Sequence, residues 1–378
     1  MNETFPEISL ILPCLNEEPG LGRSLEQITI VIQTHHLHAE VVVIDNGSTD
    51  RSRAIAANAG ARVVEEKETG YGAACLKGLS AAKGKFLLIM DADASYDFNQ
   101  IPLFIDALRN GADFVIGNRF AGTIEHNAMP WIHRHIGNPV LSGILRLFFN
   151  SSIHDAHCGM RGLTQQAFHA LTLKTTGMEF ASEMIIQIQK RNLTVKEIPI
   201  NYRCRLGQSK LKSFADGWRH LRFMLLYSPF FLFFLPGLFL FLTGAIFFAL
   251  TYFNIFSLRG IHFQSHPLFV FALLIITGYQ LMIFALFAKT YAITHLGDTP
   301  IFEKYYRYIT IEKASLAGLL LGLTGLLLFI SILLKWVRAD FGMLNEINNA
   351  VLGLTLTTIG IQTIFSSFML SILGIKER

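Results

Sequence analysis

Cysteine is scarce in this sequence and carries no recognisable chemistry. Cys14, Cys75, Cys158 and Cys204 stand alone in 378 residues, with no Cys-x-x-Cys spacing for zinc or redox work. Nothing in the sequence indicates the oxidising compartment in which disulfides persist. Four buried free thiols are therefore expected.

Metal-binding spacing is also missing among the histidines. There are 13 of them, but His154 and His157 around Asp155 match no recognised ligand pattern. The sequence therefore gives little support to a zinc site.

Charge is scarce as well, which excludes an ordinary soluble protein of this length. Only 16% of the residues are charged and 51% are hydrophobic, and the mean hydropathy is +0.41. Most Asp and Glu residues lie before residue 200, whereas long uncharged runs dominate after 229. The pattern predicts one soluble domain, long enough to build its own core, and one membrane domain.

Four uncharged apolar runs each approach the ~20 residues that a helix needs to cross the hydrocarbon core. Buried helices of a large soluble protein are the alternative, but they would need a core larger than this chain can build. We expect a soluble domain at 1–209, a juxtamembrane amphipathic helix at 210–229 and a membrane domain at 230–378. Its transmembrane helices are predicted at about 230–253, 268–288, 316–334 and 350–373.

The distribution of Lys and Arg near these runs predicts the orientation. One side carries only Arg259, Lys335 and Arg338. The other side carries most of the positive residues, namely Lys210, Lys212, Arg219, Arg222, Lys289, Lys304, Arg307, Lys313, Lys376 and Arg378. Both termini and the soluble domain are therefore expected in the cytoplasm, without a cleavable signal peptide.

Short apolar runs alternate with helix-like segments in the first 120 residues. This alternation predicts a parallel sheet with helices on both faces, in which ligands bind beyond the carboxyl ends of the strands. Helices are expected near 20–36, 50–58, 72–82 and 100–109. Strands are expected at 8–12, 41–44, 62–64, 86–90 and 114–116.

Two carboxylates, Asp91 and Asp93, directly follow the apolar run 86–90. Mg²⁺ or Mn²⁺ bridging a diphosphate suits them, because both ions take oxygen ligands and keep positions open for phosphate oxygens. An Asp-x-Asp alone is weak evidence, since a solvated turn can contain one. Its place at a strand end favours the metal interpretation.

Other polar groups follow the neighbouring strands. Asp45 ends an apolar strand and could accept hydrogen bonds from a base or a ribose, whereas Asp50 is equally well explained as a helix cap. Gly47 and Ser48 form the turn between them. Gly70-Tyr71-Gly72 offers backbone amides to a phosphate or ribose, although a plain turn would look the same.

In order along the chain, the motifs resemble those of family 2 glycosyltransferases with a GT-A fold (Rossmann-like α/β). Within that family they are similar to the polyprenyl-phosphate glycosyltransferases, such as the dolichol-phosphate mannose synthases. Seven blocks in sequence carry the resemblance, namely Leu12-Pro13-Cys14-Leu15-Asn16-Glu17-Glu18, Ile44-Asp45-Asn46-Gly47-Ser48-Thr49-Asp50, Gly70-Tyr71-Gly72-Ala73-Ala74, Asp91-Ala92-Asp93, Gly117-Asn118-Arg119, Cys158-Gly159-Met160-Arg161 and Gly207-Gln208-Ser209-Lys210.

The resemblance implies an inverting transfer of a sugar from a UDP- or GDP-linked donor to dolichyl or undecaprenyl phosphate, with Mg²⁺ or Mn²⁺. It implies catalytic roles for Asp91, Asp93, Arg119 and Arg161. It implies that the nucleotide sugar is bound by Pro13, Leu15, Asn16, Glu17, Asp45, Gly47, Ser48, Gly72, Asp91, Ala92 and Asp93. It further implies that the acceptor phosphate meets Arg119, Arg161, Ser209, Lys210 and the basic loop 203–212, although structural ion pairs could also explain the arginines.

Some positions depart from the better-known members. Tyr71 stands where many have Lys, and Ala94-Ser95 stands where many have Leu-Gln. We therefore expect Asp91 and Asp93 as metal ligands, with the Ser95 hydroxyl or water completing the shell.

Residues 211–225 mix Leu, Phe and Trp with Lys and Arg, as an interfacial helix would. A lipid phosphate anchored in the leaflet would lie beside such a helix. An ordinary connecting helix is the alternative interpretation.

Two rival functions remain open. A processive polysaccharide synthase shares this fold and the membrane, but the sequence has no Gln-x-x-Arg-Trp block. A flippase or accessory protein with an inactive transferase domain is disfavoured by the intact Asp45, Asp91 and Asp93. No nucleic-acid partner is expected, a homo-oligomer is left open, and the sugar, the base and the lipid cannot be inferred.

Overall fold

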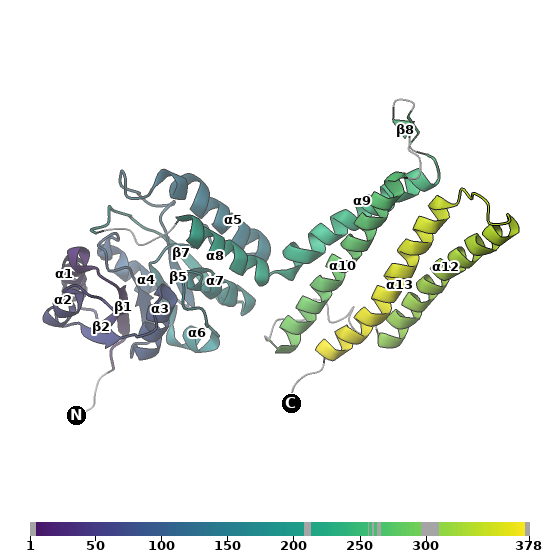
Figure 1. The fold of residues 1–378 in the computed structure, drawn as a ribbon. Coiled ribbons are helices and arrows are strands. Elements are labelled where there is room, and N and C mark those ends of the chain that lie inside the picture. The colour runs from purple at the N-terminus through teal and green to yellow at the C-terminus, as the bar shows by residue number, and fades with distance from the viewer. Residues whose placement is uncertain are drawn as a thin grey trace. The chain divides into compact units, whose positions relative to one another are not determined.

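The computed structural model describes residues 5–207, 213–255, 257–258, 261–262, 266–295 and 310–374. The chain divides into two compact units, residues 1–224 and 225–378. Figure 1 shows the first unit as an α/β domain and the second as a set of long helices.

The first unit is built on a seven-stranded sheet with the strand order β3-β2-β1-β4-β6-β5-β7. Strand β6 is antiparallel to both of its neighbours, and every other pair is parallel. The strands are β1 Ile8–Cys14, β2 Ala39–Asp45, β3 Arg62–Glu65, β4 Phe86–Ile89, β5 Phe114–Asn118, β6 Arg161–Thr164 and β7 Val195–Pro199. The α/β class is confirmed, and the five strands expected up to residue 116 run in one direction, whereas β6, for which no strand was predicted, makes the sheet mixed.

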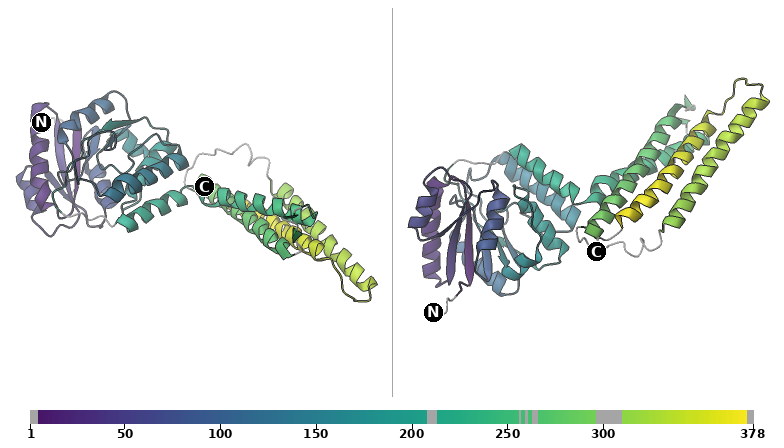
Figure 2. Two further views of the ribbon diagram at one scale, coloured as in Figure 1. Left: turned by 90° about the horizontal axis from the view of Figure 1, so that it is seen from above. Right: turned by 60° about the horizontal axis from the view of Figure 1, so that its bottom comes forward.

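Helices lie on both faces of this sheet (Figures 1 and 2). The central strands are fully buried: Leu10 and Ile11 of β1 and Leu87 and Leu88 of β4 have no exposed surface, as expected of strands covered on both sides. The helical elements are α1 Glu18–Thr34, α2 Ser52–Asn58, α3 Tyr71–Ala81, η1 Phe98–Gln100, α4 Ile101–Arg109, η2 His133–Gly137, α5 Asn138–Phe149, α6 Gln165–Ala170, α7 Phe180–Lys190 and α8 Ser213–Leu226.

Within the described residues, the second unit contains four helices that are long and apolar enough to cross a membrane, at Phe230–Tyr252, His266–Thr294, Ile311–Arg338 and Ile347–Leu373. This confirms the predicted class of the carboxyl-terminal region. Its elements are η3 Phe230–Phe234, α9 Leu235–Tyr252, β8 Ser257–Leu258, β9 Ile261–His262, α10 His266–His295, α12 Ile311–Arg338 and α13 Ile347–Leu373.

Glycines allow these helices to approach closely, because their Cα atoms face the neighbouring backbone. Gly237 of α9 lies against Gly278 of α10, and Gly318 of α12 lies against Gly360 of α13. A polar contact joins the pairs, since the Tyr279 and Thr363 hydroxyls are 2.6 Å apart. Inside a bilayer, where the hydrophobic effect does not drive helices together, small residues and hydroxyl pairs stabilise helix contacts.

Candidate active site

The carboxyl ends of β1, β2 and β4 meet at one edge of the sheet. Cys14 and Asp45, the last residues of β1 and β2, lie side by side in register. Most of the polar residues singled out from the sequence follow these ends within a few positions. The fold therefore brings the Asn16, Asp45 and Asp91-Ala92-Asp93 segments together, as expected of a doubly wound sheet.

Asp45 is held as a buried carboxylate. Its Oδ1 atom accepts a hydrogen bond from the Ser48 amide at 3.1 Å, and Oδ2 accepts from Arg53 Nη2 at 2.7 Å. Burial alone would raise the pKa of Asp45, but the bonds from Ser48 and Arg53 outweigh it and hold the pKa below its usual value. Asp45 is therefore charged and rigidly oriented, and Arg53 is a partner that sequence reasoning did not identify.

Asn16 joins the first loop to the second. It has a left-handed φ of 50°, and its side-chain oxygen accepts a hydrogen bond from the Thr49 amide at 2.7 Å. The Asn16 amide in turn donates to Ser48 Oγ at 3.0 Å. Around this contact, Pro13 is half-buried, Leu15 is exposed, Glu17 is buried and Gly47 has a positive φ of 88°. The two loops thus form one fixed surface.

Asn46, which the sequence did not single out, ties this surface to the glycine segment. Its side chain accepts from the Gly70 amide at 2.8 Å and donates to the Glu68 carbonyl at 2.6 Å. Gly72 packs tightly against the Thr175–Gly177 backbone, and the Ala73 amide donates to the Thr176 carbonyl at 3.0 Å. The Gly70 and Ala73 amides are therefore already used in hydrogen bonds within the protein.

Asp91 and Asp93 lie just beyond β4 with their charges close together. Burial and the neighbouring Asp93 carboxylate raise the pKa of Asp91 to about 6, although the Tyr96 hydroxyl donates to Asp91 Oδ2 at 3.0 Å. Asp93 Oδ1 accepts from the Ser95 amide at 3.0 Å. Two adjacent carboxylates disfavour each other's ionisation, so a bound cation would stabilise both in the charged form.

The backbone of this loop is fixed from α1. Ser24 is fully buried, and its hydroxyl donates to the Ala92 carbonyl at 3.0 Å and accepts from the Ala94 amide at 3.0 Å. Ala94 takes a left-handed φ of 60°, which is uncommon for a residue with a side chain. The loop is therefore held in an unusual conformation by a residue 70 positions away in sequence.

The donor atoms present fit a divalent cation. Among the described residues no group of three or more His, Cys, Asp or Glu side chains forms a complete metal site. Ser95, two residues after Asp93, is nevertheless fully buried, and its Oγ makes no hydrogen bond of usual geometry with the described residues. Three oxygen ligands would leave positions for diphosphate oxygens, as Mg²⁺ and Mn²⁺ favour.

Arg205 forms an ion pair with Asp93 and lies near Glu17. Its Nη2 atom lies 3.1 Å from Asp93 Oδ2 and 3.8 Å from Glu17 Oε1. The segment that carries it is hydrogen-bonded alongside the acidic loop, through Arg203 N to Ser95 O at 2.8 Å and Leu206 N to Asp93 O at 2.9 Å. The sequence analysis had included Arg205 only as one member of the basic loop 203–212.

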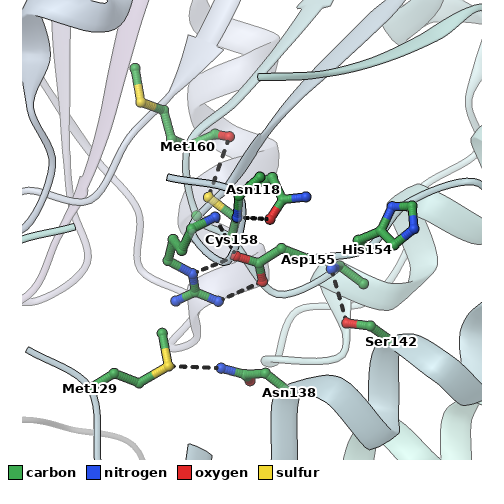
Figure 3. A network of polar contacts seen from close by, with 12 residues as sticks. Asn118, Met129, Asn138, Ser142, His154, Asp155, Cys158 and Met160 are labelled. Carbon is green, nitrogen blue, oxygen red and sulfur yellow. Dashed lines mark hydrogen bonds and ion pairs between the residues drawn. The ribbon is translucent and has the colours of Figure 1, made fainter. Parts of the chain in front are cut away.

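Arg119 forms a buried ion pair with Asp155. Its Nε and Nη2 atoms donate to the two carboxylate oxygens at 2.7 and 2.8 Å, and its backbone amide adds a third bond at 3.0 Å. The guanidinium carbon also lies 5.2 Å from the centre of the Tyr202 ring. Figure 3 shows Asp155 beside Asn118 and Cys158 in this network. A phosphate that reached Arg119 would therefore find its guanidinium already paired with Asp155.

The position of Arg161 in the structure does not suit the phosphate-binding role that was predicted for it. It is only 1% exposed, and its guanidinium donates to the carbonyls of Cys158, Ala156 and Ala181 at 2.8, 2.8 and 3.0 Å. These bonds hold the segment before β6 against α7, so in this structure Arg161 supports the fold and presents no donor group to a phosphate. Ser209 and Lys210 lie outside the described residues.

The comparisons with known proteins agree with this architecture. The model of glycosyl transferase family 2 matches residues 9–172, and that of the glycosyltransferase family 2 C-terminal transmembrane region matches residues 286–374. The fold and these matches define a membrane-bound glycosyltransferase.

Two relatives from Haloferax volcanii narrow the relationship. The low-salt glycan biosynthesis hexosyltransferase Agl6 is 36% identical over 375 residues, covering 99% of this chain and 90% of the relative. A dolichyl-phosphate hexose transferase is 32% identical over 215 residues, covering 57% and 90%. The chain therefore belongs to glycosyltransferase family 2, and it is related to dolichyl-phosphate hexose transferases.

A solved mycobacterial protein gives a fold comparison alone. It aligns with 59% of this chain and 75% of its own, with a TM-score of 0.50 and 19% sequence identity. At this identity only the architecture is shared.

Proposed function

We propose that this glycosyltransferase moves a hexose from a nucleoside-diphosphate sugar to a polyprenyl phosphate at the cytoplasmic face of a membrane. The observation that carries the proposal is the Asp91 and Asp93 pair at the end of β4, in a chain with four helices able to span a bilayer. The name of the Haloferax volcanii dolichyl-phosphate hexose transferase supports the choice of acceptor.

The nucleoside would lie against the fixed surface made by the first two loops, from Pro13 to Glu17 and from Asp45 to Ser48. Mg²⁺ or Mn²⁺ held by Asp91, Asp93 and Ser95 would supply charge neutralisation for the diphosphate. Arg205 lies next to the same carboxylates. It would turn from Asp93 to the diphosphate when the donor binds, which keeps the charge of the site balanced.

The chemistry needs positioning more than a base. A phosphate monoester with a second pKa near ~6 is mostly dianionic at neutral pH. One of its oxygens forms the bond to the anomeric carbon while the bond from that carbon to the nucleoside diphosphate breaks, and the electron pair leaves with the diphosphate. A single displacement of this kind inverts the sugar carbon.

On the acceptor side we retain Arg119, with Asp155 fixing its orientation, and the basic loop that includes Ser209 and Lys210. We leave out Arg161, because backbone carbonyls occupy its guanidinium. A paired arginine can still orient a phosphate through its remaining N–H groups. The acceptor clamp is thus proposed to depend on Asp155 as much as on Arg119.

The lysine and arginine distribution supports a cytoplasmic catalytic domain and cytoplasmic termini. We propose the boundaries 1–209, 210–229 and 230–378, with α8 as the juxtamembrane helix. Labelling of the exposed Cys204 in inside-out and right-side-out vesicles with an impermeant maleimide tests the orientation. Labelling in right-side-out vesicles alone would reverse it.

The reaction is tested with detergent-purified protein, Mn²⁺ or Mg²⁺, polyprenyl phosphate and a panel of UDP- and GDP-linked hexoses. Mass spectrometry of the lipid fraction should show one hexosyl-phosphoprenol, and chelation with EDTA should abolish it. Bound nucleotide sugar without any lipid product would overturn the polyprenyl-phosphate acceptor.

A further inference from the structure

Tyr202 joins the loop that follows the acidic pair to the loop that follows β5. Its backbone is paired as a bridge with Tyr96 on one side and with Ile124 on the other. On the second side its amide donates to the Thr123 carbonyl at 2.8 Å, and its carbonyl accepts from the Glu125 amide at 2.9 Å. Tyr202 therefore lies between the two loops, in contact with the backbone of both.

The residues beside Tyr202 are fixed to the same two loops. The Arg203 amide donates to the Ser95 carbonyl at 2.8 Å. Gly122 packs so closely on Ile200 that a Cβ atom at this glycine would collide with the Ile200 backbone. A segment held on both sides cannot shift against one loop without shifting against the other. The position of Tyr202 relative to the two loops is thus constant.

The ring of Tyr202 lies against the guanidinium of Arg119. The guanidinium carbon is 5.2 Å from the ring centre, within the ~6 Å over which a cation is attracted to an aromatic face. Arg119 is only 7% exposed, and its N–H groups are directed by Asp155. Asp155 therefore contacts the edge of the guanidinium, whereas Tyr202 contacts its planar face.

The phenol of Tyr202 lies near the polar groups of the acidic site. Burial raises the pKa of Tyr202, and the Asp93 and Asp91 carboxylates add to this effect. The Arg119 guanidinium and a hydrogen-bonding contact with Ser95 lower the same pKa by a smaller amount. The side chain is half-buried, so it is a neutral hydroxyl that reaches the surface of the site.

Transfer between two anions requires a fixed separation between the parts of the site that hold them. Productive geometry leaves only about 3–3.5 Å between the reacting atoms. An acceptor phosphate at Arg119 must meet this condition with a sugar whose diphosphate lies at Asp91 and Asp93. A tyrosine ring is rigid and has two side-chain torsions, which makes it a suitable spacer between these groups.

From this geometry we propose that Tyr202 is a positioning residue that sets the distance between the acceptor clamp and the cation site. Its ring face holds the Arg119 guanidinium. Its hydroxyl donates to Ser95 Oγ, which makes no hydrogen bond of usual geometry with the described residues, and this bond directs the remaining lone pair of Ser95 towards the cation. The role rests on the proposed function, because it presupposes a cation-bound diphosphate and a phosphate acceptor.

The hydroxyl is tested in the full-length protein by Tyr202→Phe, which keeps the ring. In the presence of UDP or GDP, Mn²⁺ should bind about tenfold more weakly, as expected when an outer partner of a metal ligand is lost. Farnesyl phosphate, a short prenyl phosphate, should bind as it does to the wild type. At a limiting Mn²⁺ concentration kcat should fall, while KM for the acceptor should stay the same. Electron paramagnetic resonance measures the first affinity and calorimetry the second.

The ring is tested by replacing Tyr202 with trifluorophenylalanine and comparing the protein with Tyr202→Phe. The fluorine atoms nearly preserve the shape of the ring and withdraw negative charge from its face, so they weaken the attraction to Arg119. Farnesyl phosphate should bind about three- to tenfold more weakly than to Tyr202→Phe, as expected for the loss of a cation–π contact. KM for the acceptor should rise, and Mn²⁺ binding should not change further.

Tyr252→Phe is the matched control. It removes a hydroxyl that donates to Asn349 Oδ1 at 2.7 Å in the second unit, and it should change neither affinity and neither kinetic constant. Wild-type affinities for Mn²⁺ and farnesyl phosphate in both Tyr202 variants would overturn the positioning role. Loss of both affinities in Tyr202→Phe would overturn it equally, because the ring and the hydroxyl would then not act separately.

Failure of the proposed reaction is recognised by a different result. Absence of glycolipid from the wild-type protein would overturn the transfer itself, and the role of Tyr202 with it. The two affinities are measured without sugar transfer. Glycolipid formation by the wild type together with unchanged affinities in the variants would therefore overturn the role of Tyr202 alone.

Discussion

Arg205 and Asp93 form an ion pair 3.1 Å long at the centre of the acidic site. Arg205 lies eight residues before Ser213, where α8 begins, whereas Asp93 follows β4, so the contact closes the site from a distant part of the chain. A divalent cation at Asp93 would compete with this guanidinium for the same oxygen. We therefore expect a cation bound at Asp93 to weaken this ion pair.

Replacing Arg205 should separate metal affinity from catalysis. Arg205→Ala should bind Mn²⁺ about tenfold more tightly, because a charge-assisted hydrogen bond that competes for Asp93 is removed, while sugar transfer falls. Mn²⁺ binding is measured by electron paramagnetic resonance in the absence of nucleotide. Arg203→Ala is the matched control, because Arg203 pairs with Asp97 at 3.3 Å. Weaker Mn²⁺ binding by Arg205→Ala would contradict the competition.

Asp93→Asn should keep the fold and lose the reaction. The amide is isosteric but cannot neutralise a cation, so transfer should fall about 10²–10³-fold, comparable to the loss of one strong electrostatic contact. The rate is followed by mass spectrometry of the glycolipid at saturating Mn²⁺. Asp106→Asn, on the exposed surface of α4, should be unchanged, and near-normal transfer by Asp93→Asn would remove the residue from the site.

The layout of the site could be predicted because it depends on strand ends. The strands before Asn16, Asp45 and Asp91 are continuous apolar runs, and such runs indicate buried strands in one sheet. Parallel strands then bring their carboxyl ends together without further information. The short strand β6 was missed, because a four-residue segment with Arg161 and Gly162 shows neither an apolar run nor an alternation.

The partners of the charged residues could not be predicted, because they depend on how the chain folds around each side chain. Arg161 looked like a phosphate ligand by its motif, yet three carbonyls from two separate segments surround its guanidinium. Arg205 reaches Asp93 only because the chain returns beside residues 93–95 after β7. The sequence shows that an arginine is present, but it does not show which oxygen atoms the guanidinium contacts.

Gly72→Ala should destabilise the catalytic unit. A Cβ atom there would collide with the backbone of Thr175, Thr176 and Gly177, which cannot turn aside as a side chain can, and such overpacking costs about 1–3 kcal/mol. Buried Cys14, Cys75 and Cys158 become reactive on unfolding, so a thiol-reactive dye in a Cys204→Ser background reports the melting of this unit.

The matched control for Gly72→Ala is Gly217→Ala in α8. No atom lies within reach of a Cβ at Gly217, so this change should raise stability by about 0.5–1 kcal/mol through helix propensity. Equal melting temperatures for the two variants would show that the Gly72 contact is not structural.

Asp155→Ala should be strongly destabilising, because it leaves Arg119 buried without its partner. Breaking a buried pair costs about 3–5 kcal/mol, whereas Glu18→Ala breaks the exposed pair with Arg51 and should change the melting temperature little. Arg119→Met combined with Asp155→Leu should recover part of the loss. An unchanged melting temperature for Asp155→Ala would mean that Arg119 does not need this carboxylate for stability.

His220 should make the catalytic unit sensitive to acid. The residue is buried between Ser182 and His157, with its ring centre 4.4 Å from that of His157. Burial and then Arg161 lower the pKa of His220 to about 4, against an opposing effect of Asp216. The unfolded chain would titrate near ~6.5. Between these values the unfolded state binds the extra proton, so stability is complete above the unfolded pKa and is lost as the pH falls towards the folded pKa.

At pH 5 this linkage amounts to about 2 kcal/mol relative to pH 7.5, or about 4–8 °C in melting temperature for a unit of this size. His220→Phe keeps a ring of similar shape and removes the titration, so its melting temperature should fall less over the same interval. Both proteins share every other titrating group, and the difference between their two slopes isolates His220. Parallel slopes would show that His220 is protonated without cost in the folded state, against the burial that the structure gives it.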